Sequence, residues 1–147
     1  MFGFVFFGLV ASGGSTYLQD ERLTALAIGA SVPVGLLTVA LLITNNLRDL
    51  PGDKIAGKYT LAVRIGDRPT RVLYIAIVTM AFLCLPYLSL VRPWALLALL
   101  ALPMAFKPIR AVVNGAKGQS LIPVLGATGR LEMIYGLLLV VGLAMGS

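Results

Sequence analysis

The sequence predicts an all-α protein, a polytopic bundle of transmembrane helices, and three observations support this prediction. Of the 147 residues, 59% are hydrophobic and only 12% are charged, whereas soluble domains average about 45–50% apolar and about 25% charged residues. The mean hydropathy is +0.94, and a chain of this length cannot bury so much apolar surface inside a water-soluble domain. The apolar residues also gather in segments close to the roughly 20 residues that cross a bilayer as a helix. We therefore expect one transmembrane domain over 1–147.

Five expected spans follow one another, joined alternately by short and long connections. The spans are Phe2–Gln19, Thr24–Thr44, Val72–Val91, Pro93 to Phe106 with an extension toward Val113, and Leu121–Met145. Residues 20–22 and 92–93 form tight turns, whereas 45–71 and 107–120 are expected as polar loops. The long loops carry nine Lys and Arg residues and the turns carry two. The positive-inside rule therefore places both long loops in the cytoplasm, with the bilayer around the spans.

The composition excludes several kinds of site. The chain has no histidine and one cysteine, which rules out an imidazole base and a multi-cysteine metal centre. Any metal must use oxygen ligands, and only six carboxylate side chains are available. The net charge of +6 comes from basic residues between apolar spans, as in cytoplasmic loops. We therefore expect no nucleic-acid partner.

The polar segment 45–71 contains the residues that point to chemistry. Asn45, Asp49 and Asp53 are four residues apart, so they share one face if the preceding helix continues through them. Two carboxylates and an amide make an oxygen-rich site. Such a site suits Mg²⁺, which takes one or two carboxylates together with substrate phosphates and water.

Cations follow these carboxylates directly, at Lys54, Lys58 and Arg64. This arrangement fits a metal–diphosphate ligand, because the metal bridges carboxylate and phosphate while Lys and Arg neutralise the remaining charge. We also assign Arg48, within the same segment, to the diphosphate. The alternative is a cytoplasmic loop whose charges only set the topology and pair with one another.

The same residues form a long, specific motif. It reads Asn45-Asn46-Leu47-Arg48-Asp49, then Asp53, then Gly57-Lys58-Tyr59-Thr60-Leu61-Ala62-Val63-Arg64-Ile65-Gly66. This motif resembles the second aspartate-rich motif of the UbiA-type intramembrane aromatic prenyltransferases, and most of all the members that prenylate 1,4-dihydroxy-2-naphthoate in menaquinone synthesis. Shorter matches flank it at 6–10, Gln19, 130–132 and 136–139. Tyr59 departs from the pattern, because the family more often has arginine there.

The resemblance implies a fold and its limits. The family fold is a bundle of nine transmembrane helices, with two aspartate-rich motifs facing each other at the cytoplasmic mouth of a central cavity. This chain is similar to helices five to nine, the carboxy-terminal half, and the 147 residues lack the first motif. We therefore expect the isolated chain to be inactive, and a separate chain carrying the missing helices is a possible partner. The implied location is the bacterial plasma membrane.

The resemblance also implies an activity, the Mg²⁺-dependent transfer of a polyprenyl group from polyprenyl diphosphate to dihydroxynaphthoate, giving demethylmenaquinone. The implied catalytic residues are Asp49, Asp53 and Lys58; the metal ligands are Asn45, Asp49 and Asp53; the diphosphate contacts are Asn45, Arg48, Lys54, Lys58 and Arg64. Another aromatic acceptor, 4-hydroxybenzoate or homogentisate, is the alternative within the enzyme class. Outside it, the alternative is a non-catalytic membrane subunit or a transporter fragment.

Two ionisable residues, Arg130 and Glu132, fall within the last apolar segment. Such residues at membrane depth are functional candidates by default. However, residues 131–147 alone would form roughly 25 Å of helix, which nearly crosses the hydrocarbon. This length favours a place near the cytoplasmic boundary for Arg130, and a structural role over substrate contact.

Overall fold

The structure is a computed structural model that describes residues 21–145, and side chains from residue 29 onward. Its elements are α2 (Glu21–Ala56), α3 (Leu61–Ile65), α4 (Asp67–Ser89), the 3₁₀ helix η1 (Pro93–Ala101), α5 (Leu102–Val113), the 3₁₀ helix η2 (Gly118–Leu121) and α6 (Ile122–Met145). The described residues contain no strand. The expected span Phe2–Gln19 lies outside them.

The helices confirm the predicted all-α polytopic bundle. Among the described residues, four segments are long and apolar enough to cross a membrane, by length and composition: Gly29–Ala56, Asp67–Ser89, Pro93–Val113 and Gly118–Met145. They correspond to the four expected spans that lie within the described residues. The η1–α5 segment crosses as one rod, because the 3₁₀ helix leads into the α-helix without a break.

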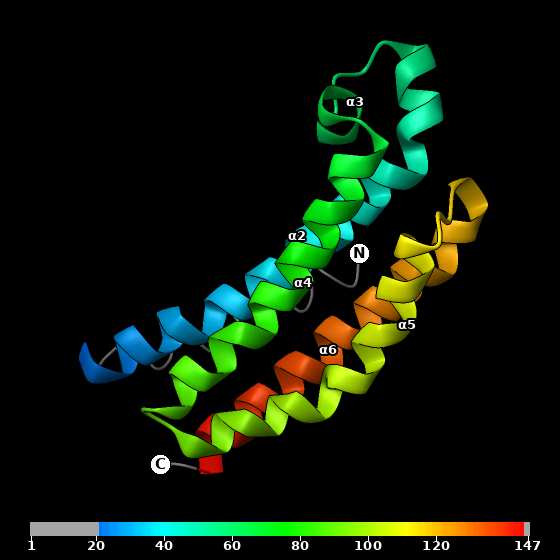
Figure 1. Cartoon of the computed structure of the whole chain (residues 1–147). Coiled ribbons are helices and arrows are strands. Elements are labelled where there is room, and N and C mark those ends of the chain that lie inside the picture. The colour runs from blue at the N-terminus through cyan, green and yellow to red at the C-terminus, as the bar shows by residue number, and fades with distance from the viewer. Residues whose placement is uncertain (1–20, 146–147) are drawn as a thin grey trace.

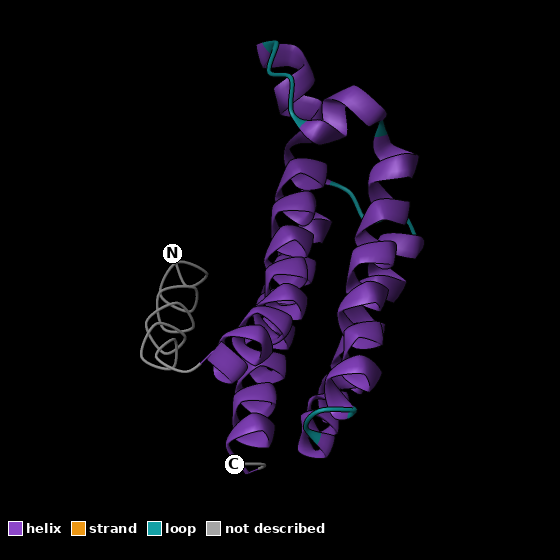
Figure 2. Cartoon of the chain, turned by 90° about the vertical axis from the view of Figure 1, so that its left-hand side faces the viewer, coloured by secondary structure: helices purple, strands orange, loops and turns teal. Residues whose placement is uncertain are grey.

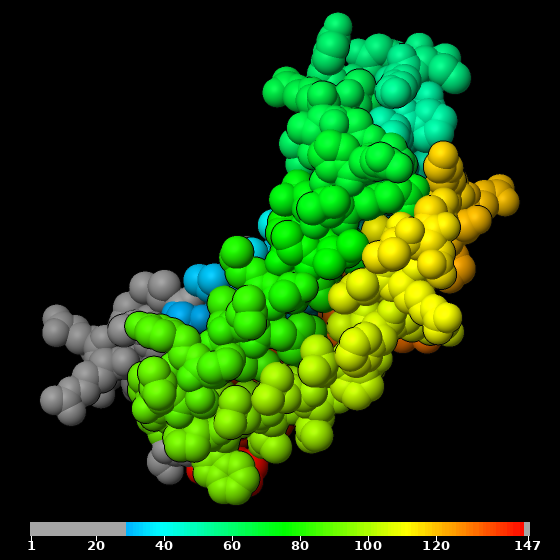
Figure 3. All heavy atoms as spheres, in the orientation of Figure 1, coloured from blue at the N-terminus to red at the C-terminus, as the bar shows by residue number. Residues whose placement is uncertain are grey.

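These four rods pack as a bundle in which each lies alongside two neighbours. Helix α2 packs against α4 and α6, and the η1–α5 rod packs against the same two helices. In Figure 1, α2 and α4 run side by side, and in Figure 2 the helical columns stand roughly parallel. Helix α3 packs on α2 and α4, at the end of the bundle that projects beyond the α5–α6 connection (Figure 3).

Small residues let η1 approach α6 closely. Ala95, Ala98 and Ala101 are fully buried, and their spacing of three residues matches the three residues per turn of a 3₁₀ helix. On the facing helix, a Cβ added to Gly142 would overlap the backbone carbonyl of Trp94. Glycine is therefore required at this crossing for backbone contact.

Helices α4 and α6 are joined by buried tyrosines. The Tyr74 hydroxyl lies 2.7 Å from Thr128 Oγ1, and the Tyr135 hydroxyl donates a 2.6 Å hydrogen bond to the carbonyl of Ala81. The Tyr135 ring also meets the Phe82 ring edge-on, with centroids 5.2 Å apart. These contacts satisfy polar groups that would otherwise be costly inside the bundle.

The expected long loops are shorter than the sequence suggested. Helix α2 continues through Pro51 to Ala56, and α5 continues to Val113. Within these two expected loops, the non-helical residues are 57–60, Gly66 and 114–117. Hydropathy marks where a helix leaves the hydrocarbon, but a polar helix can continue into water, so the polar residues were misread as loop.

Candidate functional site

The carboxylate-bearing end of α2 is terminated by Gly57. This glycine has φ +73°, a left-handed conformation that glycine adopts without steric cost. The Lys58 amide donates to the Asp53 carbonyl at 2.9 Å, and the Gly57 amide donates to the Lys54 carbonyl at 3.3 Å. This pair of bonds is a Schellman motif. It turns the chain so that Lys58 follows directly on the last turn that carries Asp53.

The three predicted metal ligands lie on one uninterrupted helix. Asn45, Asp49 and Asp53 all belong to α2, and four-residue spacing stacks them on one face, about 6 Å apart along the axis. Asn45 and Asp53 are half-buried and Asp49 is exposed. The helical register on which the site prediction depended is therefore present.

Asp49 is engaged by cations in the structure. Arg48 Nε and Nη2 donate to its two carboxylate oxygens at 2.9 and 3.2 Å. The Lys58 ammonium group also lies within electrostatic range of Asp49. Arg48 and Asp49 keep 34% and 49% of their side-chain surface exposed, so both are accessible to a ligand. The structure thus brings together an acid and two of the predicted diphosphate contacts.

The other predicted cations lie further from this acid. Lys54 is exposed and lies within electrostatic range of Asp67 at the start of α4. Arg64 is exposed in the last turn of α3, and within residues 29–145 no ion pair joins it to Asp49 or Asp53. These two cations contribute positive charge to this end of the bundle without contacting the carboxylates.

The acidic groups alone do not make a complete metal centre. Among the described residues, no group of three or more His, Cys, Asp or Glu side chains could hold a metal ion. Asp49 and Asp53 with the Asn45 amide can supply part of a Mg²⁺ shell, which in proteins is commonly completed by substrate phosphates and water. The donor set therefore fits a metal that arrives with a diphosphate.

A second arginine–aspartate pair at the same end was not foreseen. Arg71 Nε and Nη2 donate to Asp67 at 2.8 and 3.1 Å, and its guanidinium also donates to the carbonyls of Val112 at 2.8 Å and Ala116 at 2.7 Å. These carbonyls belong to the end of α5 and the turn after it. The guanidinium therefore caps α5 and ties it to α4. The four-residue spacing of Asp67 and Arg71 was the available signal.

The sequence pattern also indicated no role for the side chain of Thr60. Its hydroxyl oxygen is buried and has no hydrogen-bond partner in the described part of the chain. It directly precedes α3, a position where threonine commonly caps the helix, but no cap bond forms here. The motif pattern contained this threonine without indicating what its hydroxyl contacts.

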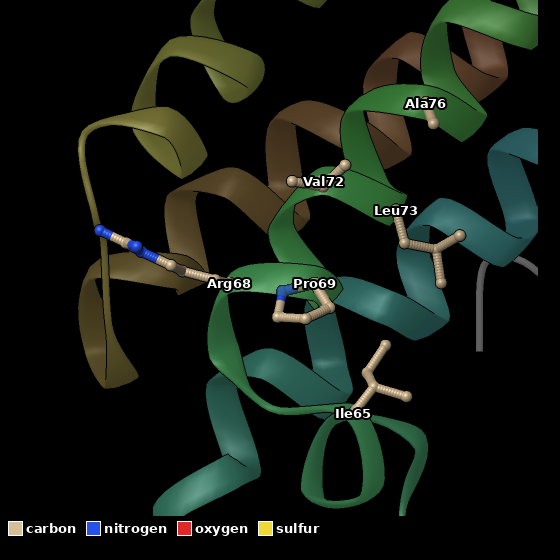
Figure 4. A pocket seen from close by; sticks show the side chains of 6 residues that line it. All are labelled: Ile65, Arg68, Pro69, Val72, Leu73 and Ala76. Atoms are coloured by element: carbon tan, nitrogen blue, oxygen red, sulfur yellow. The ribbon is translucent and has the colours of Figure 1, made fainter.

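A shallow apolar depression lies on the outer side of the α3–α4 junction (Figure 4). Its lining residues are Ile65, Arg68, Pro69, Val72, Leu73 and Ala76. In Figure 4 the Arg68 side chain extends away from the apolar side chains. None of the predicted metal ligands or diphosphate contacts lines this depression. It is therefore separate from the α2 face with Asn45, Asp49 and Asp53, which we call the carboxylate face.

Comparison with known proteins places the chain in a family. Residues 1–124 match the model of the UbiA prenyltransferase family. The chain is 41% identical over 97% of its length to a 1,4-dihydroxy-2-naphthoate octaprenyltransferase of Mycobacterium tuberculosis, covering 49% of that protein. It is 35% identical to the protein of the same name from Haemophilus influenzae, over 97% of this chain and 47% of that one.

A eukaryotic relative matches as well. The chain is 30% identical to UbiA prenyltransferase domain-containing protein 1 of Dictyostelium discoideum, over 97% of this chain and 42% of that one. The chain thus spans about half the length of the curated relatives it matches. The family match covers the aspartate-bearing face of α2 and the turn at Gly57. On these grounds, the chain belongs to the UbiA prenyltransferase family.

Proposed function

We propose that this chain forms one wall of a Mg²⁺-dependent aromatic prenyltransferase of the bacterial plasma membrane. The reaction transfers a polyprenyl group from polyprenyl diphosphate to 1,4-dihydroxy-2-naphthoate, releasing diphosphate and carbon dioxide and giving demethylmenaquinol, the reduced form of demethylmenaquinone. The observation that carries the proposal is the continuous α2 face with Asn45, Asp49 and Asp53. Relatives named as octaprenyltransferases for this acceptor supply the substrate assignment.

Asp49, Asp53 and Asn45 would hold the metal. Mg²⁺ held there would supply positive charge that offsets the charge of the leaving diphosphate. The protein's part is to place two ionised oxygen donors one helical turn apart at the mouth of the bundle, with Asn45 one turn deeper. Two carboxylates on one wall cannot neutralise a whole diphosphate complex, so we expect further ligands from a facing wall.

Arg48 and Lys58 would stabilise the leaving group. The Arg48–Asp49 pair is exposed, and exposed ion pairs contribute only about 0–1 kcal/mol. Arg48 can therefore exchange Asp49 for a phosphate oxygen at little cost when Asp49 turns to the metal. Lys58 already lies within electrostatic range of Asp49. Lys54 and Arg64 would add longer-range attraction for the anionic donor.

The apolar rods would protect the reactive carbon. The electron pair of the broken carbon–oxygen bond leaves with the diphosphate, and the allylic cation remains. The ring carbon that bears the carboxylate attacks this cation, and the carboxylate then leaves as carbon dioxide, while the electron pair of its bond to the ring restores the aromatic ring. Helices that exclude water keep the cation from being hydrolysed before this attack.

The test is reconstitution in bacterial membranes. The chain is expressed in two ways, alone and together with the part of the Mycobacterium tuberculosis relative that this chain does not match. Prenylated naphthoquinol is then measured in both preparations, with and without Mg²⁺. We expect activity only on co-expression and only with Mg²⁺. Activity of the chain alone would contradict the one-wall proposal. No Mg²⁺-dependent binding of polyprenyl diphosphate in either preparation would contradict the prenyltransferase assignment and favour a non-catalytic subunit.

The acceptor is tested in the same membranes. We expect 1,4-dihydroxy-2-naphthoate to be prenylated in preference to 4-hydroxybenzoate or homogentisate when each is supplied at equal concentration. Preferential prenylation of one of the other two would overturn the acceptor assignment and leave the donor chemistry in place.

A further inference from the structure

A carboxyl group lies deep in the bundle, far from the motif in sequence. Glu132, on α6, is 3% exposed, and its Oε1 accepts a 2.6 Å hydrogen bond from Thr38 Oγ1 on α2. Within residues 29–145, the ion pairs are Arg48–Asp49 and Arg71–Asp67, so no cation in that range pairs with Glu132. This buried acid is held by a neutral hydroxyl.

Thr38 connects this acid to the candidate site. It precedes Asn45 by seven residues and Asp49 by eleven on the same helix, spacings that place all three on one face. At about 1.5 Å per residue, Thr38 lies roughly 10 Å deeper than Asn45. Leu42, between them on this face, is 58% exposed. The face is therefore accessible down to Leu42, one helical turn from Thr38.

Joining two helices does not require a carboxyl group. At the neighbouring α4–α6 interface, the neutral pair of Tyr74 and Thr128 makes a buried hydrogen bond of 2.7 Å. A carboxyl group in hydrocarbon is much more costly than a hydroxyl. A residue that only packed α6 against α2 would be served by leucine or threonine, so the acid at position 132 indicates a polar ligand.

We propose that Glu132, oriented by Thr38, accepts a hydrogen bond from a hydroxyl group of the aromatic acceptor. This inference rests on the proposed function and adds a residue that selects and orients the acceptor. Thr38 engages Oε1, and Oε2 receives the ring hydroxyl. The acceptor ring then lies below the carboxylate face, between Glu132 and the allylic carbon of the donor.

Charge decides which hydroxyl faces Glu132. An acidic side chain repels the carboxylate of dihydroxynaphthoate, so that carboxylate turns toward the cationic mouth with Arg48 and Lys58. The 4-hydroxyl lies farther from the carboxylate than the adjacent 1-hydroxyl, and it is then the group directed at Glu132. A hydrogen bond donated by this hydroxyl fixes how the ring is turned and therefore which ring carbon meets the cation.

The test measures acceptor binding and turnover in the reconstituted membranes. Variants Glu132→Leu, Glu132→Gln and Thr38→Val are compared with the control Tyr135→Phe, which also removes one buried hydrogen bond from α6. We expect Glu132→Leu to raise the KM and the Kd for dihydroxynaphthoate at least ~10-fold, the range of a lost hydrogen bond to a charged group. Glu132→Gln, which keeps an acceptor oxygen, is expected to have a smaller effect, and Tyr135→Phe none.

An acceptor analogue without the 4-hydroxyl tests the proposed hydrogen bond to Glu132 directly. The wild type should bind 1-hydroxy-2-naphthoate, which lacks the 4-hydroxyl, at least ~10-fold more weakly than the dihydroxy compound, and Glu132→Leu should remove this preference. A preference that persists in Glu132→Leu and Glu132→Gln would overturn the inference. So would equal increases in donor and acceptor KM, which indicate a structural role.

Failure of the proposed function gives a different result. Mg²⁺-dependent binding of polyprenyl diphosphate is measured without acceptor, and we expect it to be unchanged in all four variants. If the wild type lacks this binding, the proposed function is wrong. If the binding is present and the analogue preference is absent from the wild type, only the role of Glu132 is wrong.

Discussion

Two arginine–aspartate pairs lie at the same end of the bundle, and their surroundings differ. Arg48 keeps 34% of its side-chain surface exposed and contacts the adjacent Asp49. Arg71 keeps only 9% exposed, and it binds Asp67 and the backbone carbonyls of Val112 and Ala116. The first pair can exchange partners with a ligand. The second has its donors committed to the protein, and it holds α4 to α5.

The comparison shows that the same pair of residue types has different roles depending on burial. Exposed pairs contribute about 0–1 kcal/mol because water and salt screen them. Removing the buried Arg71 guanidinium costs about 1–3 kcal/mol for each carbonyl that it leaves without a donor, whereas Asp67, which keeps 37% of its side-chain surface exposed, is rehydrated. We therefore expect substitutions at the first pair to change substrate handling and those at the second to change stability.

The largest expected effect is at the buried guanidinium. Arg71→Leu should lower the free energy of unfolding by about 3 kcal/mol, because the carbonyls of Val112 and Ala116 lose their donor at about 1–3 kcal/mol each. Chemical unfolding in detergent measures it. Arg71→Lys keeps the charge but not the planar set of donors, so its free energy of unfolding should lie between those of Arg71→Leu and the wild type. If Arg71→Leu had the same unfolding midpoint as the wild type, the Arg71–Asp67 pair would not contribute to stability.

The next largest effect is expected at the two acids of the carboxylate face, Asp49 and Asp53. Asp49→Asn and Asp53→Asn should each reduce turnover of the reconstituted enzyme at least ~100-fold, about 2.7 kcal/mol of transition-state stabilisation, because an amide is a poorer ligand for Mg²⁺. The unfolding midpoint should stay close to that of the wild type. Prenyl transfer that survives both substitutions would rule out the metal assignment.

Asp67 provides the matched control for Asp49. Asp67→Asn keeps one acceptor oxygen for Arg71, so the free energy of unfolding should fall by about 1 kcal/mol, while the KM for polyprenyl diphosphate stays unchanged. Parallel unfolding and kinetic measurements test both parts. A turnover loss as large as that of Asp49→Asn would remove the distinction between the two pairs.

The smallest effect on stability is expected at Arg48. Arg48→Gln should change the free energy of unfolding by less than about 1 kcal/mol, yet raise the KM for polyprenyl diphosphate by roughly threefold to tenfold through the loss of one charge-assisted hydrogen bond. Arg64→Gln serves for comparison, since Arg64 does not contact the acids and should change this KM less. An unchanged KM in Arg48→Gln would place Arg48 outside the diphosphate site.

Local features of the chain determined the helical face and its end. The spacing of Asn45, Asp49 and Asp53 predicts one face of a helix, and α2 runs through all three. Gly57 ends this helix with a left-handed φ of +73°. These features were predictable because helix periodicity and glycine's conformational freedom act within one or two turns of chain.

Hydropathy located the spans but not the ends of the helices. Burial in lipid requires apolar side chains, so the four described rods were found from composition. A helix continues into water wherever its backbone bonds and capping allow. The residues between Asn45 and Ala56 were therefore expected within a loop, although they extend α2 by three turns.

The sequence by itself determined the class of fold, the membrane-embedded segments, the carboxylate face and the family, because each depends on composition or on spacing along one helix. Only the tertiary structure decided the partners across helices. Arg71 meets the carbonyls of Val112 and Ala116, and Glu132 meets Thr38 from 94 residues away. Such pairs depend on how the rods are rotated and aligned against one another, and that arrangement is set by packing over the whole bundle, as where Gly142 meets the backbone of Trp94.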